Sequence, residues 1–334
     1  MNVKGKCKSG YTTTLLVDQP MEESHMNKTA VLLSGRLGSW RNSLPTLLQN
    51  LAVPSNADIF IVTSITNTLR KTPAGPYVSS YDREAWHEKS KGMVREDVEV
   101  SRDEMLLLTE VLGDNLKNLS FVEDLSEGNK VDLACLRARM ARAIADYQEE
   151  SIALGIPPPC SGHAVPPEDP GIGYVVDQYF RVRIAYELMQ EYEFVRGQQY
   201  DYVMRARPDF IVEYPWDIRT QALDPSVVYV VGSARGSVNH EEMEWADDFC
   251  WFSSRYVARS LFPQLHRMGL ITNRRYNTFN KTQGLDYVFS PETQFSLLLH
   301  ELDLPVQAVP LYRMGRYTPG DDGWDYHNYL FGKL

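Results

Sequence analysis

Short apolar runs alternate with segments of helical spacing in the first part of the chain. The first apolar run covers residues 30–33 and meets a loop with two glycines at 34–38. Apolar residues then recur at helical spacing over 40–51, and a second apolar run follows at 58–63. A strand, a helix and a strand in such close succession form a βαβ unit, so we expect two parallel strands joined by a right-handed crossover.

The pattern is less regular in the middle of the chain. Residues 66–96 are polar and rich in turn-forming residues, which predicts a long surface excursion. Helical spacing recurs over 104–116 and again over 133–152. Residues 153–173 are rich in proline and glycine, so they predict a loop or a lid rather than a regular element.

Regular patterns return in the second half. Residues 174–192 predict a helix, with Tyr179, Val182, Ala185, Tyr186 and Met189 on one face. The segment 200–209 has an apolar centre that predicts a strand, and Pro208 ends it because proline cannot donate to the strand ladder. Asp209 is therefore expected just past the carboxyl end of that strand. Further strands are predicted at 227–231, 249–252 and 305–309, and a helix at 293–302.

These elements predict an α/β fold with a Rossmann-type, mostly parallel central sheet flanked by helices. We expect a flexible tail at 1–25, followed by a single large domain with insertions at 26–334. The length is ample for burying a core.

Charge and cysteine usage narrow the function classes. The chain has 334 residues and a formal net charge of -10, which repels polyanions and excludes general binding to nucleic acid or anionic membranes. A local cluster of cations can still hold a small phosphorylated ligand. The cysteines, at positions 7, 135, 160 and 250, have neither zinc-site nor disulfide-framework spacing, so we interpret them as reduced thiols of a cytoplasmic protein. No secretory signal or membrane-spanning run is expected.

Polar residues follow three of the predicted strands. They are Ser34 to Arg36, Thr63 with Ser64, and Arg205 to Asp209. Ligands of open α/β sheets bind outside the carboxyl ends of the strands. A carboxylate beside two arginines at such an edge can hold a divalent cation that bridges phosphates, while the arginines neutralise the other oxygens. The alternative interpretation is that Arg207 and Asp209 only form an ion pair at the surface.

Several of these pieces, taken in order, carry a family resemblance. They are Ala-Val-Leu-Leu-Ser-Gly-Arg at 30–36, Asn-Ala-Asp-Ile-Phe-Ile at 56–61, Arg-Ala-Arg-Pro-Asp at 205–209, Asp-Asp-Phe at 247–249 and Ser-Pro-Glu at 290–292. Together the chain resembles the nucleotide-sugar-dependent glycosyltransferases of the GT-A type, in a group with bacterial, algal and large-virus members. The resemblance spans residues 28 to about 310.

The resemblance implies a cation site and a donor site. Asp209 would be the last carboxylate of the family's Asp-x-Asp element, which binds a divalent cation, Mn²⁺ or Mg²⁺, on the diphosphate of the sugar donor. Arg207 stands where the first carboxylate would be, so arginines could replace part of the cation's charge. His327 would complete the metal site. The donor-binding residues would be Ser34, Arg36, Thr63, Gln178, Arg181, Arg205 and Arg207.

The resemblance also divides the domain. It implies a nucleotide-binding half at 26–125, a helical and proline-rich insertion at 126–173, and a donor-metal and acceptor half at 174–334. An inverting transfer to an acceptor hydroxyl requires a carboxylate base. Asp247 is the first candidate, since it lies in an acidic run beside tryptophans that suit a sugar ring, and Glu292 is the second. The acidic run could instead be a solvated face.

The expected function is therefore transfer of a sugar from a nucleoside diphosphate sugar to a glycan or glycoconjugate acceptor. Two alternatives remain open. One is a catalytically silent module of the same fold that binds carbohydrate or nucleotide, since fold alone does not establish activity. The other is a sulfo- or phosphotransferase, because Ser34 to Arg36 resembles an anion-binding loop, although the Gly-x-x-x-x-Gly-Lys-Ser/Thr motif is absent.

Overall fold

The computed structural model describes residues 28–38, 40–70, 95–122, 153, 170–212, 214–231, 246, 248–267, 291–309 and 314–316. The predicted tail at 1–25 and the predicted helix at 133–152 lie outside these ranges, as does most of the predicted lid at 153–173.

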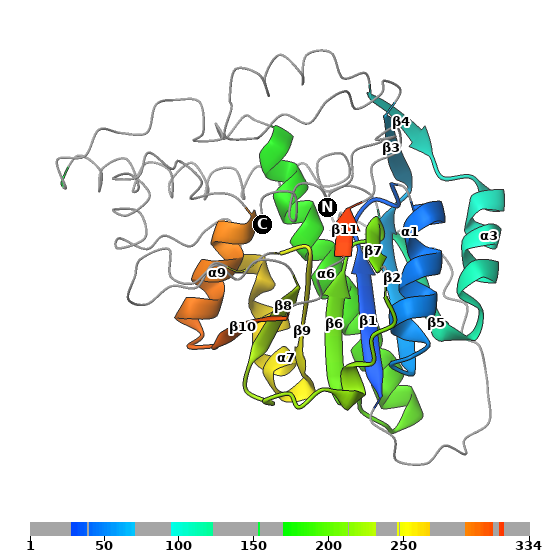
Figure 1. Cartoon of the computed structure of the whole chain (residues 1–334). Helices are drawn as coiled ribbons and strands as arrows, with labels where there is room; N and C mark the ends of the chain where they lie inside the picture. Colours follow the sequence, from blue (N-terminus) through cyan, green and yellow to red (C-terminus); the bar gives the residue numbers. More distant parts are fainter. Residues whose placement is uncertain are drawn as a thin grey trace, which may run out of the picture.

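A seven-stranded sheet forms the centre of the described structure (Figure 1). Its order is β10-β8-β9-β6-β1-β2-β5. Only β9 among these seven strands runs antiparallel to its neighbours, so the prediction of a mostly parallel sheet is confirmed. The strands are β1 (Thr29–Ser34), β2 (Ala57–Ser64), β5 (Leu116–Val122), β6 (Tyr202–Ala206), β8 (Val228–Val231), β9 (Cys250–Ser254) and β10 (Val306–Val309).

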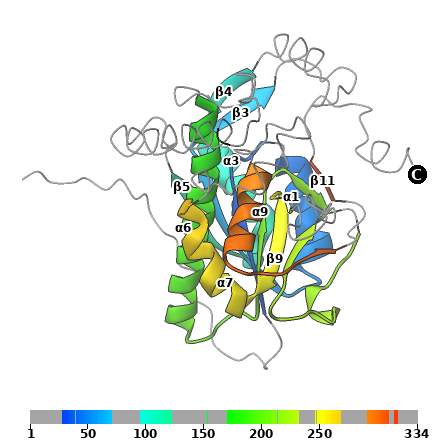
Figure 2. The ribbon, with the colours of Figure 1, turned by 90° about the vertical axis from the view of Figure 1, so that its left-hand side faces the viewer.

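Helices cover both faces of the sheet, as Figure 2 shows from the side. One face packs against α6 (Pro170–Arg196), α7 (Arg255–Leu261), the 3-10 segment η4 (Phe262–Arg267) and α9 (Pro291–Glu301). The other face packs against α1 (Trp40–Leu47), its π-helical continuation η1 (Leu48–Ala52) and α3 (Arg102–Leu112). This is the three-layer α/β arrangement that alternating strands and helices predict.

The apolar runs of the sequence become strands that are buried on both faces. In β1, Ala30 and Leu32 face α6, while Val31 and Leu33 face α1. Such a continuous apolar run is typical of a central parallel strand. The apolar face predicted for residues 174–192 is also confirmed, because all five of its residues are at most 2% exposed within α6.

The prediction of a helix over 104–116 is wrong at its carboxyl end. Helix α3 ends at Leu112, and a 3-10 turn, η2 (Gly113–Asn115), leads directly into β5. Gly113 has φ +49°, a left-handed conformation that ends helices and favours glycine. The sequence therefore did not predict the seventh strand, β5. It pairs in parallel with β2 and extends the sheet by one strand.

Two predicted irregular segments are partly regular. The ends of the predicted excursion at 66–96 pair as antiparallel strands, β3 (Thr66–Arg70) and β4 (Arg95–Glu99), which follow the carboxyl end of β2. The predicted lid at 153–173 is wrong over its last four residues, since α6 begins at Pro170. Proline fits the first turn of a helix because the amide hydrogen that it lacks has no helical partner there.

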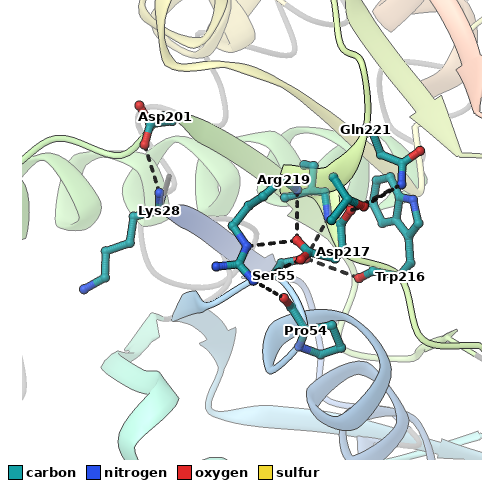
Figure 3. Close-up of polar contacts among 10 residues, drawn as sticks. Lys28, Pro54, Ser55, Asp201, Trp216, Asp217, Arg219 and Gln221 are labelled. Carbon is teal, nitrogen blue, oxygen red and sulfur yellow. Dashed lines mark hydrogen bonds and ion pairs between the residues drawn. The ribbon is translucent and has the colours of Figure 1, made fainter. Parts of the chain in front are cut away.

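A short segment after β6 is hydrogen-bonded to the end of η1 and the residues that follow it. It contains β7 (Phe210–Val212), which pairs with β11 (Met314–Arg316), and the 3-10 turn η3 (Ile218–Thr220). The Asn50 amide donates to the Val212 carbonyl at 2.6 Å, and Arg219 donates to the Pro54 carbonyl at 2.6 Å (Figure 3). These bonds fix the backbone that follows Asp209. The sequence did not reveal β7 and β11, because three residues are too few for a recognisable alternation.

Candidate functional site

The strand order reverses next to β1. From β1 the chain moves to β2 and β5 on one side of the sheet, and later returns to place β6 on the other side. Ligands of open α/β sheets bind at such a switch point, outside the carboxyl ends of the strands. Leu33 pairs in register with Ala206, so the loop after β1 and the residues after β6 leave the sheet side by side.

We call the polar groups gathered at this edge the switch-point site. Its members come from β1 and its loop, β6 and the residues that follow it, the first half of α6 and the residue pair before β9. They are Ser34, Arg36, Gln178, Arg181, Arg205, Arg207, Asp209 and Asp248.

The loop after β1 packs closely on the end of β6. Gly38 has φ +54°, and a Cβ at this position would lie 3.5 Å from the Asp209 Cβ. The Ser43 hydroxyl at the start of α1 donates to the Pro208 carbonyl at 2.6 Å. Glycine is therefore favoured at position 38 both by its conformation and by the approach of Asp209. This contact fixes the Asp209 backbone against the loop.

Arg207 and Asp209 form a two-pronged ion pair. The Arg207 Nε donates to Asp209 Oδ1 at 2.8 Å, and its Nη2 donates to Oδ2 at 2.9 Å. The Arg207 guanidinium also lies over the Phe249 ring, 5.5 Å from its centroid. The ion pair between Arg207 and Asp209, which the sequence offered as an alternative to a cation site, is thus present. It lies within the site rather than at an exposed surface, since Asp209 is only 6% exposed.

Arg205 is a fully buried cation. Strand alternation places it with Val203 on the α6 face of β6, between Leu32 of β1 and Trp251 of β9. It is 0% exposed, and its three guanidinium nitrogens have no hydrogen-bond partner within the described structure. The buried Ser34 hydroxyl on β1 also has none. Buried charges in proteins are normally paired, so an unpaired guanidinium at a switch point indicates a binding site for an anion.

The first half of α6 closes the site from the side of the helix layer. The chain leaves the other end of α6 at the amino edge of the sheet, where the Tyr200 hydroxyl donates to Asp58 at 2.6 Å. Gln178 and Tyr179 therefore lie toward the carboxyl edge. There the Gln178 amide donates to Asp248 Oδ2 at 2.6 Å, and the Tyr179 hydroxyl donates to the same oxygen at 3.1 Å.

Arg181 brings a further positive charge to the same edge. It is 5% exposed, and burial, with a smaller contribution from the like charge of Arg36, lowers its pKa to about 10. A nearby cation acts in this direction because it disfavours the charged form. The fold therefore holds two guanidinium groups close enough to repel each other, an arrangement that an anion between them would relieve.

The fold brings together most of the residues that the sequence nominated for donor binding. Thr63 lies at the same edge, but strand alternation places it with Ile61 on the α1 face, opposite Ser34. Glu292 is in the first turn of α9, where only its backbone is described. Asp247 and His327 lie outside the described residues. No group of three His, Cys, Asp or Glu residues that could hold a metal is present in the ranges described.

Sequence reasoning missed Asp248. It chose the neighbouring Asp247 from the same acidic run, because the sequence does not show which carboxylate turns inward. Asp248 is 1% exposed and accepts two hydrogen bonds from α6. The signal lay in tertiary structure, since Gln178 and Tyr179 are about 70 residues earlier in the chain.

No protein-family model matches the chain, and no curated protein was found to be similar to it. Within the described ranges, none of the helices has both the length and the apolar character that crossing a bilayer requires.

Proposed function

We propose that the protein is a glycosyltransferase of the GT-A type, which transfers a sugar from a nucleoside diphosphate sugar to an acceptor hydroxyl. The observation that carries the proposal is the gathering of guanidinium groups at the switch point between β1 and β6. Arg36, Arg181 and Arg205 come from three different segments, and the sequence resemblance had named all three as donor-binding residues. Guanidinium groups are well suited to phosphate oxygens.

The chemistry assigns further roles. Departure of a nucleoside diphosphate builds up negative charge, which the arginines would stabilise, and the acceptor hydroxyl must lose a proton. Asp247 remains the first candidate base and Glu292 the second. Asp248 joins them as a third carboxylate, held at this edge by Gln178 and Tyr179.

The proposal is tested by measuring nucleoside diphosphate release from a panel of UDP, GDP and dTDP sugars with mixed glycoside acceptors. The wild-type protein should release the nucleotide from at least one donor. Asp209→Ala should abolish this release, because Arg207 loses the carboxylate that holds it in place. Wild-type turnover by the Asp209→Ala variant would contradict the donor-site assignment.

The chain offers a matched control. Asp217 and Arg219 form the same two-pronged pair, with both contacts at 2.9 Å, in the segment fastened to η1 (Figure 3). Asp217→Ala should therefore leave turnover at the wild-type level. Donor binding without any turnover would contradict the catalytic part of the proposal and support a silent binding module.

The base is identified by comparing three variants. Asp247→Asn should retain donor binding and lose about 100-fold or more in turnover, the typical contribution of a general base. Unchanged turnover in this variant would move the assignment to Asp248 or Glu292, which Asp248→Asn and Glu292→Gln separate.

A further inference from the structure

We infer that the switch-point site binds the diphosphate of its ligand through guanidinium groups that take the place of a divalent cation, with Arg205 as the central contact. The inference rests on the proposed function for the identity of the ligand, a nucleoside diphosphate sugar. It concerns how the diphosphate is held.

The residues present do not fit a divalent cation. Both Asp209 oxygens accept hydrogen bonds from Arg207, at 2.8 and 2.9 Å. A cation bound to Asp209 would have to displace that guanidinium and would then lie beside it. Divalent cations are bound by several oxygen ligands, whereas Arg207 stands where the first carboxylate of an Asp-x-Asp element would be.

Arg205 differs from Arg255, another buried arginine of the described structure. Arg255 is 7% exposed and donates to both oxygens of Glu193, at 2.8 and 2.6 Å, and to the Tyr186 hydroxyl. It is a structural cation with its counter-charge built in. Arg205 is more deeply buried, yet no acceptor in the described structure meets its guanidinium nitrogens. An external anion would provide the missing acceptor.

The described residues of the site suit an anionic ligand. They include four guanidinium groups and two carboxylates. The diphosphate of a nucleoside diphosphate sugar carries two negative charges at neutral pH. Arg36 and Arg181 are close enough for their charges to repel each other, and a bound diphosphate would reverse that penalty.

The test is calorimetric titration of the purified protein with UDP, GDP and inorganic pyrophosphate, in EDTA and again in Mn²⁺. At least one of these probes should bind in EDTA, with an affinity within about twofold of that in Mn²⁺. Arg205→Met should weaken its binding at least tenfold, and Arg205→Lys should restore part of the affinity, because the charge returns without the planar donors.

Arg183→Met is the matched control. Arg183 is a partly exposed arginine of α6 paired with Glu187 at 2.8 Å, so its loss removes the same charge outside the site. This variant should bind the probes as the wild type does. Binding that disappears in EDTA, an absence of binding by every probe, or unchanged binding by Arg205→Met would each overturn the inference.

The outcomes separate this inference from the proposed function. If the probes bind through Arg205 in EDTA but no sugar is transferred, the inference of an anion site is supported and the proposed glycosyltransferase function is refuted. If sugar transfer requires Mn²⁺ and probe binding is lost in EDTA, the proposed function is supported and the inference that guanidinium groups replace the cation is refuted.

Discussion

Two of the buried arginines, Arg205 and Arg255, should respond to the same substitution in opposite ways. Arg205→Met removes a buried charge that has no partner in the described structure, whereas Arg255→Met removes the counter-charge of the buried Glu193. Methionine suits both positions because it retains most of the apolar stem and adapts its shape to the space available. Comparing the two variants therefore distinguishes an arginine that binds a ligand from an arginine that stabilises the fold.

The magnitudes follow from burial. An unpaired buried ion costs several kcal/mol even after relaxation, and replacing buried charges with apolar side chains of similar volume stabilises proteins by up to about 4 kcal/mol. The smaller methionine leaves a cavity that costs about 1 kcal/mol. We expect Arg205→Met to raise the free energy of unfolding by about 1 to 2 kcal/mol. Breaking the Arg255–Glu193 pair should lower it by about 3 to 5 kcal/mol.

Urea unfolding monitored by tryptophan fluorescence measures both changes, in a buffer without phosphate. Trp251, which pairs with Arg205 across β6 and β9, is fully buried and should report the loss of the core. Added pyrophosphate should stabilise the wild type, because a ligand that binds only the native state shifts unfolding, and should leave Arg205→Met unchanged. A loss of stability in Arg205→Met comparable to that in Arg255→Met would refute the reasoning, since it would show that Arg205 has a structural partner.

Three further outcomes follow from the geometry. Burial, and then the charge of Asp58, raise the Tyr200 pKa well above its ordinary value of 10.0, so the unfolded chain loses this proton first. The contribution of Tyr200 to stability is therefore complete below about pH 10 and is lost as the pH rises further, which unfolding curves measure, and Tyr200→Phe should reduce this loss. Gly38→Ala should cost about 1 kcal/mol and weaken probe binding, whereas Gly113→Ala, where φ is +49° and the space is open, should affect stability alone. Asp248→Asn should retain or strengthen probe binding, because it removes a negative charge from the anion site; binding weakened more than threefold would contradict this.

The alternation of apolar runs was enough to predict most of the sheet and one face of α6. It failed where local pattern is weak. The polar residues within β5, and the three-residue strands β7 and β11, acquire their pairing from tertiary contacts that no window of sequence contains. For the site, the sequence placed Asp209 past a strand end because Pro208 cannot continue a ladder. It could not show that Arg205 would be buried with no acceptor among the residues that the structure describes, since that depends on the packing of β1, β9 and α6.

The depth of Arg205 and the overall charge of the protein together constrain how an anion reaches the site. A net charge of -10 repels an approaching diphosphate at long range, while the local excess of arginine charge attracts it within about one Debye length, near 8 Å at physiological salt. Arg205 is 0% exposed, so side chains that cover it must move before an anion can touch it. Association that needs such a conformational change is slower than association with a site that is already open. Once the ligand is bound, salt screens a buried contact only weakly, so added salt should change dissociation from Arg205 little.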